Sequence, residues 1–302
     1  MTRTYLSHLF RFAPSPNGYL HLGHAYSALI NHEMAQAIGG SLLLRIEDID
    51  VARCRPEFEQ AIYEDLHWLG LSWEEPVRRQ SEHFDAYAEA LAQLEQQGIV
   101  YPCFCSRSEV AGVLSEHPDW PRDPDGSPLY PGTCRNLSSA ERHVRLAAGQ
   151  PAALRLDMAA ALAKVNERLG QSIGWREYGS GMKGREVSAE PALWGDAVLS
   201  RKDIPASYHI AVVVDDALQG VTDVVRGEDL FMATGLHRLL QILLELPAPC
   251  YHHHELLRDA AGRKLSKSLR AKSLRTLRHE GLTPDEVKTQ LGLPQRSFAF
   301  VP

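Results

Sequence analysis

The amino-acid sequence predicts an α/β fold, in which a parallel nucleotide-binding sheet is interrupted by an inserted subdomain. Apolar strand-like runs alternate with helical periodicity over the first hundred residues, as βαβ units require. From residue 101 to about 135 the chain becomes rich in proline and contains three cysteines, which indicates an insertion rather than a further βαβ unit. A chain of 302 residues is long enough to bury a full core around such a sheet.

The first hundred residues predict strands and helices in alternation. We expect strands over about 8–13 and 41–47, and helices over 24–38, 56–69 and 81–97. Each helical pattern stops at a glycine, namely Gly39, Gly70 or Gly98, and Pro56 suits the first position of its helix.

The second half predicts a return to the same fold after the insertion. Ser138 and Glu141 form a capping-box pattern for a helix, and Thr283 begins a similar pattern near the C-terminus. Strands are expected over 212–216 and 221–225, followed by a helix that ends near 244. We therefore divide the chain into the first half of the catalytic domain (1–100), an inserted subdomain (101–195), the second half (196–250) and a lysine-rich loop with a short helical end (251–302).

Composition indicates a globular protein without a global nucleic-acid surface. The formal net charge is −6, so any RNA-binding surface has to be a local patch. The sequence contains no run of 18 apolar residues and no signal-peptide pattern, from which we expect a cytoplasmic protein without a membrane partner. We also expect a monomer.

Two short segments predict an ATP site. His21, Gly23 and His24 lie in a turn between a strand and a helix N-terminus, where backbone N–H groups and the helix dipole attract anions. Far along the chain, Lys264 and Lys267 flank Ser266 in a turn suited to a polyphosphate. Taken alone, the lysine segment reads more simply as a solvated basic loop.

Three cysteines of the insertion predict a metal site. Cys103 and Cys105 form a C-x-C pair, and Cys134 follows in the same proline-rich stretch, which favours zinc ligation over inert buried thiols. On chemistry alone His117 is the better fourth ligand, because a phenol must lose its proton to bind a metal well. The run 252–254 contains three adjacent histidines, but neighbouring strand residues point to opposite faces, so we expect a polar strand rather than a metal site.

Five motifs, in order along nearly the whole chain, resemble class I glutamyl-tRNA synthetases. They are RFAPSPNGYLHLGH (11–24), RIEDID (45–50), YHIAVVVDD (208–216), VRGED (225–229) and KLSKS (264–268). The resemblance implies a class I synthetase Rossmann-type nucleotide-binding fold with an inserted zinc-containing subdomain. It also implies ATP, Mg²⁺ and L-glutamate as ligands, and one structural Zn²⁺ per chain.

The same resemblance assigns roles to residues. It implies catalytic roles for His21, His24 and Lys267, and ATP binding by these three with Gly23, Lys264 and Ser266. For glutamate it implies five contacts, from Arg11, Ser15, Glu47, Tyr208 and Arg226. A substrate with two carboxylates and one ammonium needs two cations and one anion, which Arg11, Arg226 and Glu47 supply. For the metal it implies Tyr130 beside the three cysteines, with His117 as the alternative.

The molecule that would accept the glutamyl group is expected to differ from that of a conventional glutamyl-tRNA synthetase. Only 34 residues follow Ser268, fewer than an anticodon-binding domain needs. The chain is thus most similar to the short paralogues of the family, which attach glutamate to queuosine at the wobble position of tRNA(Asp). The alternatives are a truncated enzyme that charges the 3′ end of tRNA(Glu), a small-molecule nucleotidyltransferase and a non-catalytic relic. Full-length relatives often carry Asn where this chain has Val212, from which we expect weak binding of free glutamate.

Overall fold

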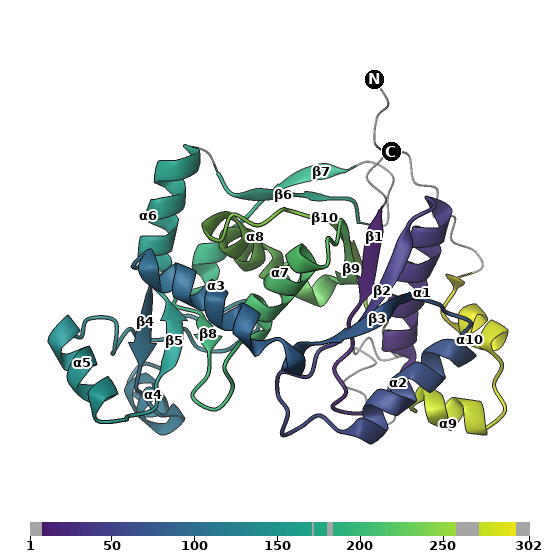
Figure 1. Cartoon of the computed structure of the whole chain (residues 1–302), viewed down its shortest axis with the longest axis horizontal. Helices are drawn as coiled ribbons and strands as arrows, with labels where there is room; N and C mark the ends of the chain where they lie inside the picture. Colours follow the sequence, from purple (N-terminus) through teal and green to yellow (C-terminus); the bar gives the residue numbers. More distant parts are fainter. Residues whose placement is uncertain (1–7, 171, 180–183, 258–271, 294–302) are drawn as a thin grey trace.

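The computed structural model describes residues 8–170, 172–179, 184–257 and 272–293 (Figure 1). Its main element is a seven-stranded sheet in the order β3-β2-β1-β9-β10-β6-β7. The strands are β1 (Leu9–Phe12), β2 (Ser41–Ile46), β3 (Glu74–Arg79), β6 (Gly174–Glu177), β7 (Arg185–Ser188), β9 (Asp223–Gly227) and β10 (Cys250–His254). All neighbouring pairs are parallel except β6 with β7. The carboxyl ends of six strands therefore face the same edge of the sheet.

Helices pack around this sheet. They are α1 (Leu22–Ala37), α2 (Pro56–Trp68), α3 (Phe84–Gln96), α6 (Met158–Leu169), α7 (Tyr208–Leu218), α8 (Ala233–Leu243), α9 (Leu274–His279) and α10 (Pro284–Gln290). Two of them, α2 and α10, begin where the sequence predicts. Pro56 is the first residue of α2, and Thr283 caps α10 by accepting a hydrogen bond from the Glu286 amide. Among the described residues, no helix has the length and apolar character needed to cross a bilayer.

A second, smaller sheet forms a separate lobe (Figure 1). Its strands β4 (Val100–Cys103), β5 (Ala153–Leu156) and β8 (Val198–Ser200) pair antiparallel in the order β4-β5-β8. The helices α4 (Arg107–Ser115) and α5 (Ser139–Ala147) lie in this lobe, and each starts with a serine capping box. The lobe contains the proline- and cysteine-rich stretch from residue 101 to about 135, where the composition changes.

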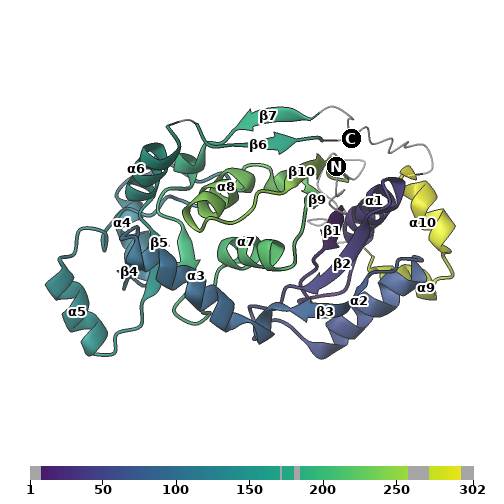
Figure 2. The ribbon, with the colours of Figure 1, turned by 45° about the horizontal axis from the view of Figure 1, so that its top comes forward.

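The hydrophobic core has two main parts. One lies around α7 and α8, which Figure 2 shows between α3 on one side and β6 on the other. The other lies between α1, α2 and the strands β1 and β2, and the helices α9 and α10 close it from outside. This arrangement fixes α1 and α7 against the sheet, and both helices carry site residues.

The structure confirms most predicted elements and corrects one. The strand expected over 212–216 is wrong, because these residues belong to α7, an 11-residue helix. Residues 210–216 are all buried, so the β-branched run lies in a helix that is apolar on nearly every side. The run 252–254 is a strand as predicted, and it is a buried inner strand of the sheet.

The pairing of strands departs at two places from the domain boundaries that the sequence suggests. Strands β6 and β7 lie within the segment 101–195, yet they extend the large sheet next to β10. Strand β8 lies beyond residue 195, yet it pairs with β5 in the small sheet. The boundaries themselves remain predictions.

Candidate active site

A cavity of about 470 Å³ opens at the carboxyl edge of the large sheet. In open parallel sheets this edge is where ligands bind, and the volume suits a small molecule. Its wall contains Arg11 of β1, Glu47 directly after β2, Arg226 of β9 and His254 of β10. We call it the first cavity. Three residues predicted to bind glutamate thus come from different strands and meet in one space.

A buried ion network holds Arg11 and Glu47 in place. The carboxylate of Asp216, on α7, accepts hydrogen bonds from Arg11 Nε at 3.1 Å and from Arg45 Nη1 at 2.7 Å. Arg45 is fully buried and donates from Nη2 to Glu47 at 3.1 Å. Burial acts to raise the pKa of Asp216, but the charges of Arg11 and Arg45 outweigh it and hold that pKa below its usual value. The network fixes the positions of Arg11 and Glu47 on the cavity wall.

The Arg11 guanidinium retains donors that face the cavity. Its Nε binds Asp216 and its Nη1 makes a long contact of 3.5 Å to the Val225 carbonyl. Within the part of the chain that the structure describes, Nη2 of Arg11 has no hydrogen-bond partner. Because guanidinium N–H groups recognise carboxylates, Arg11 can bind an anionic ligand without breaking its link to Asp216.

Arg226 is buried by a different set of contacts. Its Nε donates to His253 at 3.1 Å, and its terminal nitrogens contact Thr234 at 2.6 Å and His237 at 3.2 Å. No carboxylate among the described residues forms an ion pair with it; the nearest link is indirect, because His253 Nδ1 lies 2.6 Å from Glu177. Burial and the Arg226 charge together hold the pKa of His237 well below its usual value, so this imidazole is neutral and can accept from the guanidinium.

The first turn of α1 brings two imidazoles to the cavity. His21 is the N-cap, and its Nδ1 accepts from the Gly23 amide at 3.0 Å. In return, the His21 amide donates to Nδ1 of His24 at 3.2 Å, and the two rings lie 3.9 Å apart between centroids. A neutral ring whose Nδ1 accepts carries its proton on Nε2, so each Nε2 is a donor. A Cβ on Gly23 would come within 2.9 Å of the His21 ring, which explains the need for glycine.

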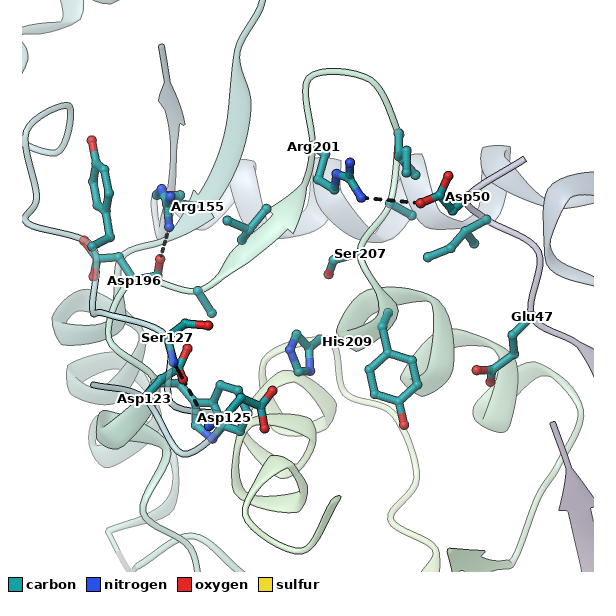
Figure 3. A pocket seen from close by; sticks show the side chains of 18 of the residues that line it. Glu47, Asp50, Asp123, Asp125, Ser127, Arg155, Asp196, Arg201, Ser207 and His209 are labelled. Carbon is teal, nitrogen blue, oxygen red and sulfur yellow. Dashed lines mark hydrogen bonds and ion pairs between the residues drawn. The ribbon is translucent and has the colours of Figure 1, made fainter. Parts of the chain in front are cut away.

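A second cavity, of about 550 Å³, adjoins the first between the two lobes (Figure 3). Ser15, Glu47 and Tyr208 line both cavities and form their shared wall. In Figure 3, Arg155 and Arg201 lie along one edge of the second cavity, and Asp123 and Asp125 lie along the opposite one. The wall contains orphaned polar atoms, since Ser207 Oγ and Arg155 Nε are buried and have no hydrogen-bond partner in the described chain. Such atoms favour a polar ligand over an apolar one.

The three cysteines of the small lobe converge. Their sulfur atoms lie within 4.8 Å of one another, and Cys105 and Cys134 are 3.5 Å apart. The Tyr130 hydroxyl lies 3.3 Å from the Cys105 sulfur and accepts from the Cys134 amide at 2.9 Å. Tetrahedral zinc with bonds of about 2.3 Å to sulfur would separate two sulfurs by roughly 3.8 Å, so the cluster has the right size for a metal. His117 is not among the grouped residues, and its ring packs on Trp120 instead.

Comparison with known proteins decides the family. The family described as "tRNA synthetases class I (E and Q), catalytic domain" matches residues 9–293, which is nearly the whole chain. The chain belongs to this family. It is therefore a ligase of the aminoacyl-tRNA synthetase type, and the cavity at the sheet edge lies within its matched catalytic domain.

Individual relatives are similar over most of the synthetase chain. A "Glutamyl-Q tRNA(Asp) synthetase" of Rhodobacter capsulatus is 46% identical over 94% of this chain and 99% of its own length. A "Glutamate--tRNA ligase" of Aquifex aeolicus is 37% identical over 94% of this chain, but this match covers only 56% of that protein. The crystal structure of a glutamate tRNA ligase from Elizabethkingia meningosepticum, "in complex with its amino acid", has a TM-score of 0.76 at 26% identity, and the chain spans 62% of it.

The structure brings together the predicted residues that it describes. Arg11, Ser15, Glu47, Tyr208 and Arg226 line the first cavity with His21, Gly23 and His24. Lys264, Ser266 and Lys267 lie outside the described residues. Val212 is buried in the core and lines neither cavity. Sequence reasoning missed the residues that hold Arg226, because His237, Thr234 and Glu177 belong to no motif.

Proposed function

We propose that this synthetase activates L-glutamate with ATP and transfers the glutamyl group to queuosine at the wobble position of tRNA(Asp). The observation that carries the activation step is the meeting of Arg11, Arg226 and Glu47 with the imidazoles of α1 in one cavity. Two cations and one anion complement an amino acid with two carboxylates and one ammonium. The acceptor rests on the relatives named for it, of which the one from Rhodobacter capsulatus matches over 99% of its length.

In this proposal each charged group of glutamate has a partner. Arg11 receives the side-chain carboxylate through Nη2, while Asp216 keeps the guanidinium oriented. Glu47 receives the α-ammonium. All the N–H groups of Arg226 contact protein atoms, so this residue contributes a fixed positive charge near the α-carboxylate more than new hydrogen bonds. Ser15 and Tyr208 add hydroxyl contacts from the shared wall.

Activation then requires alignment rather than a base. An oxygen of the α-carboxylate, already an anion, attacks the α-phosphorus of ATP, and the bond to pyrophosphate breaks with glutamyl-adenylate as product. The Nε2 protons of His21 and His24 stabilise the phosphate oxygens, at the positive end of the α1 dipole. Mg²⁺ bound with ATP supplies further charge neutralisation.

Lys264, Ser266 and Lys267 are proposed to close the ATP site from the other side. They lie outside the described residues. Of the residues that flank their segment, Leu257 lines the first cavity, and Ser273 forms a β-bridge with His21, which lines that cavity too. Lys267 is proposed to stabilise the charge that builds on the phosphates, with Lys264 as a supporting charge.

The second cavity is proposed to hold the acceptor nucleoside. A hydroxyl oxygen of queuosine attacks the glutamyl carbonyl at the shared wall, an ester bond forms, AMP leaves, and the hydroxyl proton departs with the phosphate or solvent. The orphaned Ser207 hydroxyl and Arg155 Nε offer hydrogen bonds to a polar nucleoside there. Proteins read single-stranded RNA loops because their bases can be splayed out into such spaces.

The test compares acceptors for the glutamyl group. We expect transfer of labelled glutamate to an anticodon stem–loop of tRNA(Asp) that carries queuosine, and none to the same stem–loop with guanine. A separate stem–loop avoids periodate treatment of the 3′ end, which would also cleave the queuosine diol. Charging of intact tRNA(Glu) at its 3′ end, with no product on the stem–loop, would instead support the truncated conventional enzyme.

We also propose one structural Zn²⁺ bound by Cys103, Cys105, Cys134 and Tyr130. Burial raises the pKa of the Cys105 thiol to about 11, so without a metal this residue stays protonated at neutral pH. A bound cation reverses that preference, because metals bind thiolates. If Tyr130→Phe retains full zinc with unchanged coordination while His117→Ala loses it, the fourth ligand is His117 and not Tyr130.

The cytoplasmic location and the monomeric state stay predictions.

A further inference from the structure

A basic groove lies on the small lobe beside the second cavity. It is lined by Arg107, Arg155, Arg201 and Lys202, with Cys105, Ser106, Asp203 and the strand residues Ala153 and Val198 between them. Its volume is about 650 Å³. Four of its side chains are cationic and one is acidic, whereas the whole chain has a formal net charge of −6. The groove is therefore a local positive patch on an acidic protein.

Most of this positive charge is not neutralised by the protein. Within the described ranges, Arg107, Arg155 and Lys202 form no ion pair with any carboxylate. Lys202 donates to the Phe104 carbonyl at 2.6 Å, and Arg155 donates to the Asp196 backbone carbonyl at 2.8 Å. Arg201 is the exception, since it pairs with Asp203 at 3.0 Å. Three cations thus remain for an external anion.

The groove is continuous with the proposed acceptor site. Arg155, Val198 and Arg201 line both the groove and the second cavity. Figure 3 shows Arg155 and Arg201 on the edge of that cavity, opposite Asp123 and Asp125. The second cavity in turn shares its wall with the first. A ligand that enters the second cavity from the small lobe therefore passes the unpaired cations.

We propose that this groove binds the phosphates of the RNA strand that flanks the acceptor nucleoside. The inference rests on the proposed function, because it assumes an RNA acceptor in the second cavity. A row of Arg and Lys side chains suits a repeated phosphate chain, and such contacts fix the register of a nucleic acid without reading its sequence. Arg155 is held by its stacking on Tyr130, 3.8 Å from the ring centroid, and marks the point where the strand turns into the cavity.

The experiment removes two exposed cations of the groove that touch neither cavity. The double variant Arg107→Gln, Lys202→Gln replaces both cations with neutral amides outside the two cavities, and thermal unfolding shows whether losing the Lys202 bond to the Phe104 carbonyl disturbs the fold. A matched control, Arg176→Gln with Arg185→Gln, removes the same charge from exposed residues of β6 and β7, at the edge of the large sheet. Both proteins are compared with the wild type by thermal unfolding and by ATP–pyrophosphate exchange. Their affinity for a labelled queuosine stem–loop is measured by fluorescence anisotropy at several salt concentrations.

We expect the groove variant to lose RNA affinity and to keep glutamate activation. Glutamate-dependent exchange stays at the wild-type rate in both variants. The groove variant binds the stem–loop about tenfold more weakly, and the slope of log affinity against log salt falls by about 0.7 for each lost phosphate contact. Wild-type affinity and slope in the groove variant, or an equal loss in the control, would overturn the inference. If the wild type activates glutamate but does not modify the stem–loop, the proposed function fails by itself, and the binding slopes still decide whether the groove is an RNA surface.

Discussion

Substituting Asp216 tests whether the buried ion network fixes the proposed glutamate site. In Asp216→Asn the charged carboxylate oxygen that accepts from both Arg11 Nε at 3.1 Å and Arg45 Nη1 at 2.7 Å becomes an uncharged amide oxygen. Removing one partner from a buried pair costs about 3 to 5 kcal/mol, and the retained acceptor places this variant near the lower value. We expect a loss of about 3 kcal/mol in the free energy of unfolding, measured with urea. The KM for glutamate in pyrophosphate exchange should rise about tenfold, because Arg11 loses its anchor.

A matched control separates burial from charge. Asp203 also pairs with an arginine, at 3.0 Å, but its side chain is 66% exposed, whereas that of Asp216 is 7% exposed. Exposed pairs contribute at most about 1 kcal/mol, so Asp203→Asn should unfold almost as the wild type does. If Asp216→Asn loses no more stability than the control, the network does not hold the site.

The stabilisation by Asp216 should also depend on pH. Because the pKa of Asp216 is lowered in the folded state, its carboxylate stabilises the fold above its unfolded-state pKa, and this stabilisation is lost as the pH falls through its folded-state pKa.

Three further results are expected. Lys267→Ala should depress pyrophosphate exchange by about 10² or more, and normal exchange would remove the lysine segment from the mechanism. The purified protein should hold one zinc ion, which Cys134→Ser should release while thermal unfolding of the small lobe shifts to lower temperature; a metal-free wild type would contradict this. Asp65 is buried, its carboxylate oxygens have no hydrogen-bond partner among the described residues, and burial raises its pKa to about 6. The folded state thus holds its proton to higher pH than the unfolded chain, so stability falls from about pH 4 to 6. Asp65→Asn should abolish this fall and unfold at higher urea than the wild type at pH 8.

The charged ends of the strands could be predicted from the sequence, because parallel strands place their carboxyl ends at one edge. Arg11, Glu47 and Arg226 follow or end apolar runs, and the structure brings all three into one cavity. The capping patterns at Ser138 and Thr283 are equally local, since each residue bonds an amide three positions on. Such features need no knowledge of the tertiary fold.

Helix α7 could not be recognised by its composition. Val212, Val213 and Val214 favour a strand by intrinsic preference, but they are buried in one core cluster with residues of α3, α8 and the small sheet, and this packing outweighs β propensity. After the helix, Gly220 has a positive φ of 70°, the conformation that favours glycine beyond a helix end. A buried helix loses the polar stripe that usually reveals its period, so its interior reads as a strand.

The contacts of Arg226 depend on the fold alone. Thr234 and His237 come from α8, His253 comes from β10, and Glu177 comes from a segment that the sequence places in the insertion. No local sequence motif links any of these residues to Arg226. Such a cluster can be found only when the strands that carry its members have been placed side by side.

The wall that Ser15, Glu47 and Tyr208 share between the two cavities has a consequence for inhibitor design. Spaces of about 470 and 550 Å³ meet there, so one compound can occupy both. With the adenylate in the first cavity and the acceptor in the second, as proposed above, a stable analogue of the adenylate joined at its acyl group to a cyclic diol would place its linker at this wall. Tethering two fragments raises the effective concentration of the second, so the joined compound should bind far more tightly than either fragment. Enzymes with a differently shaped acceptor side would bind only the adenylate half, which would make the compound selective.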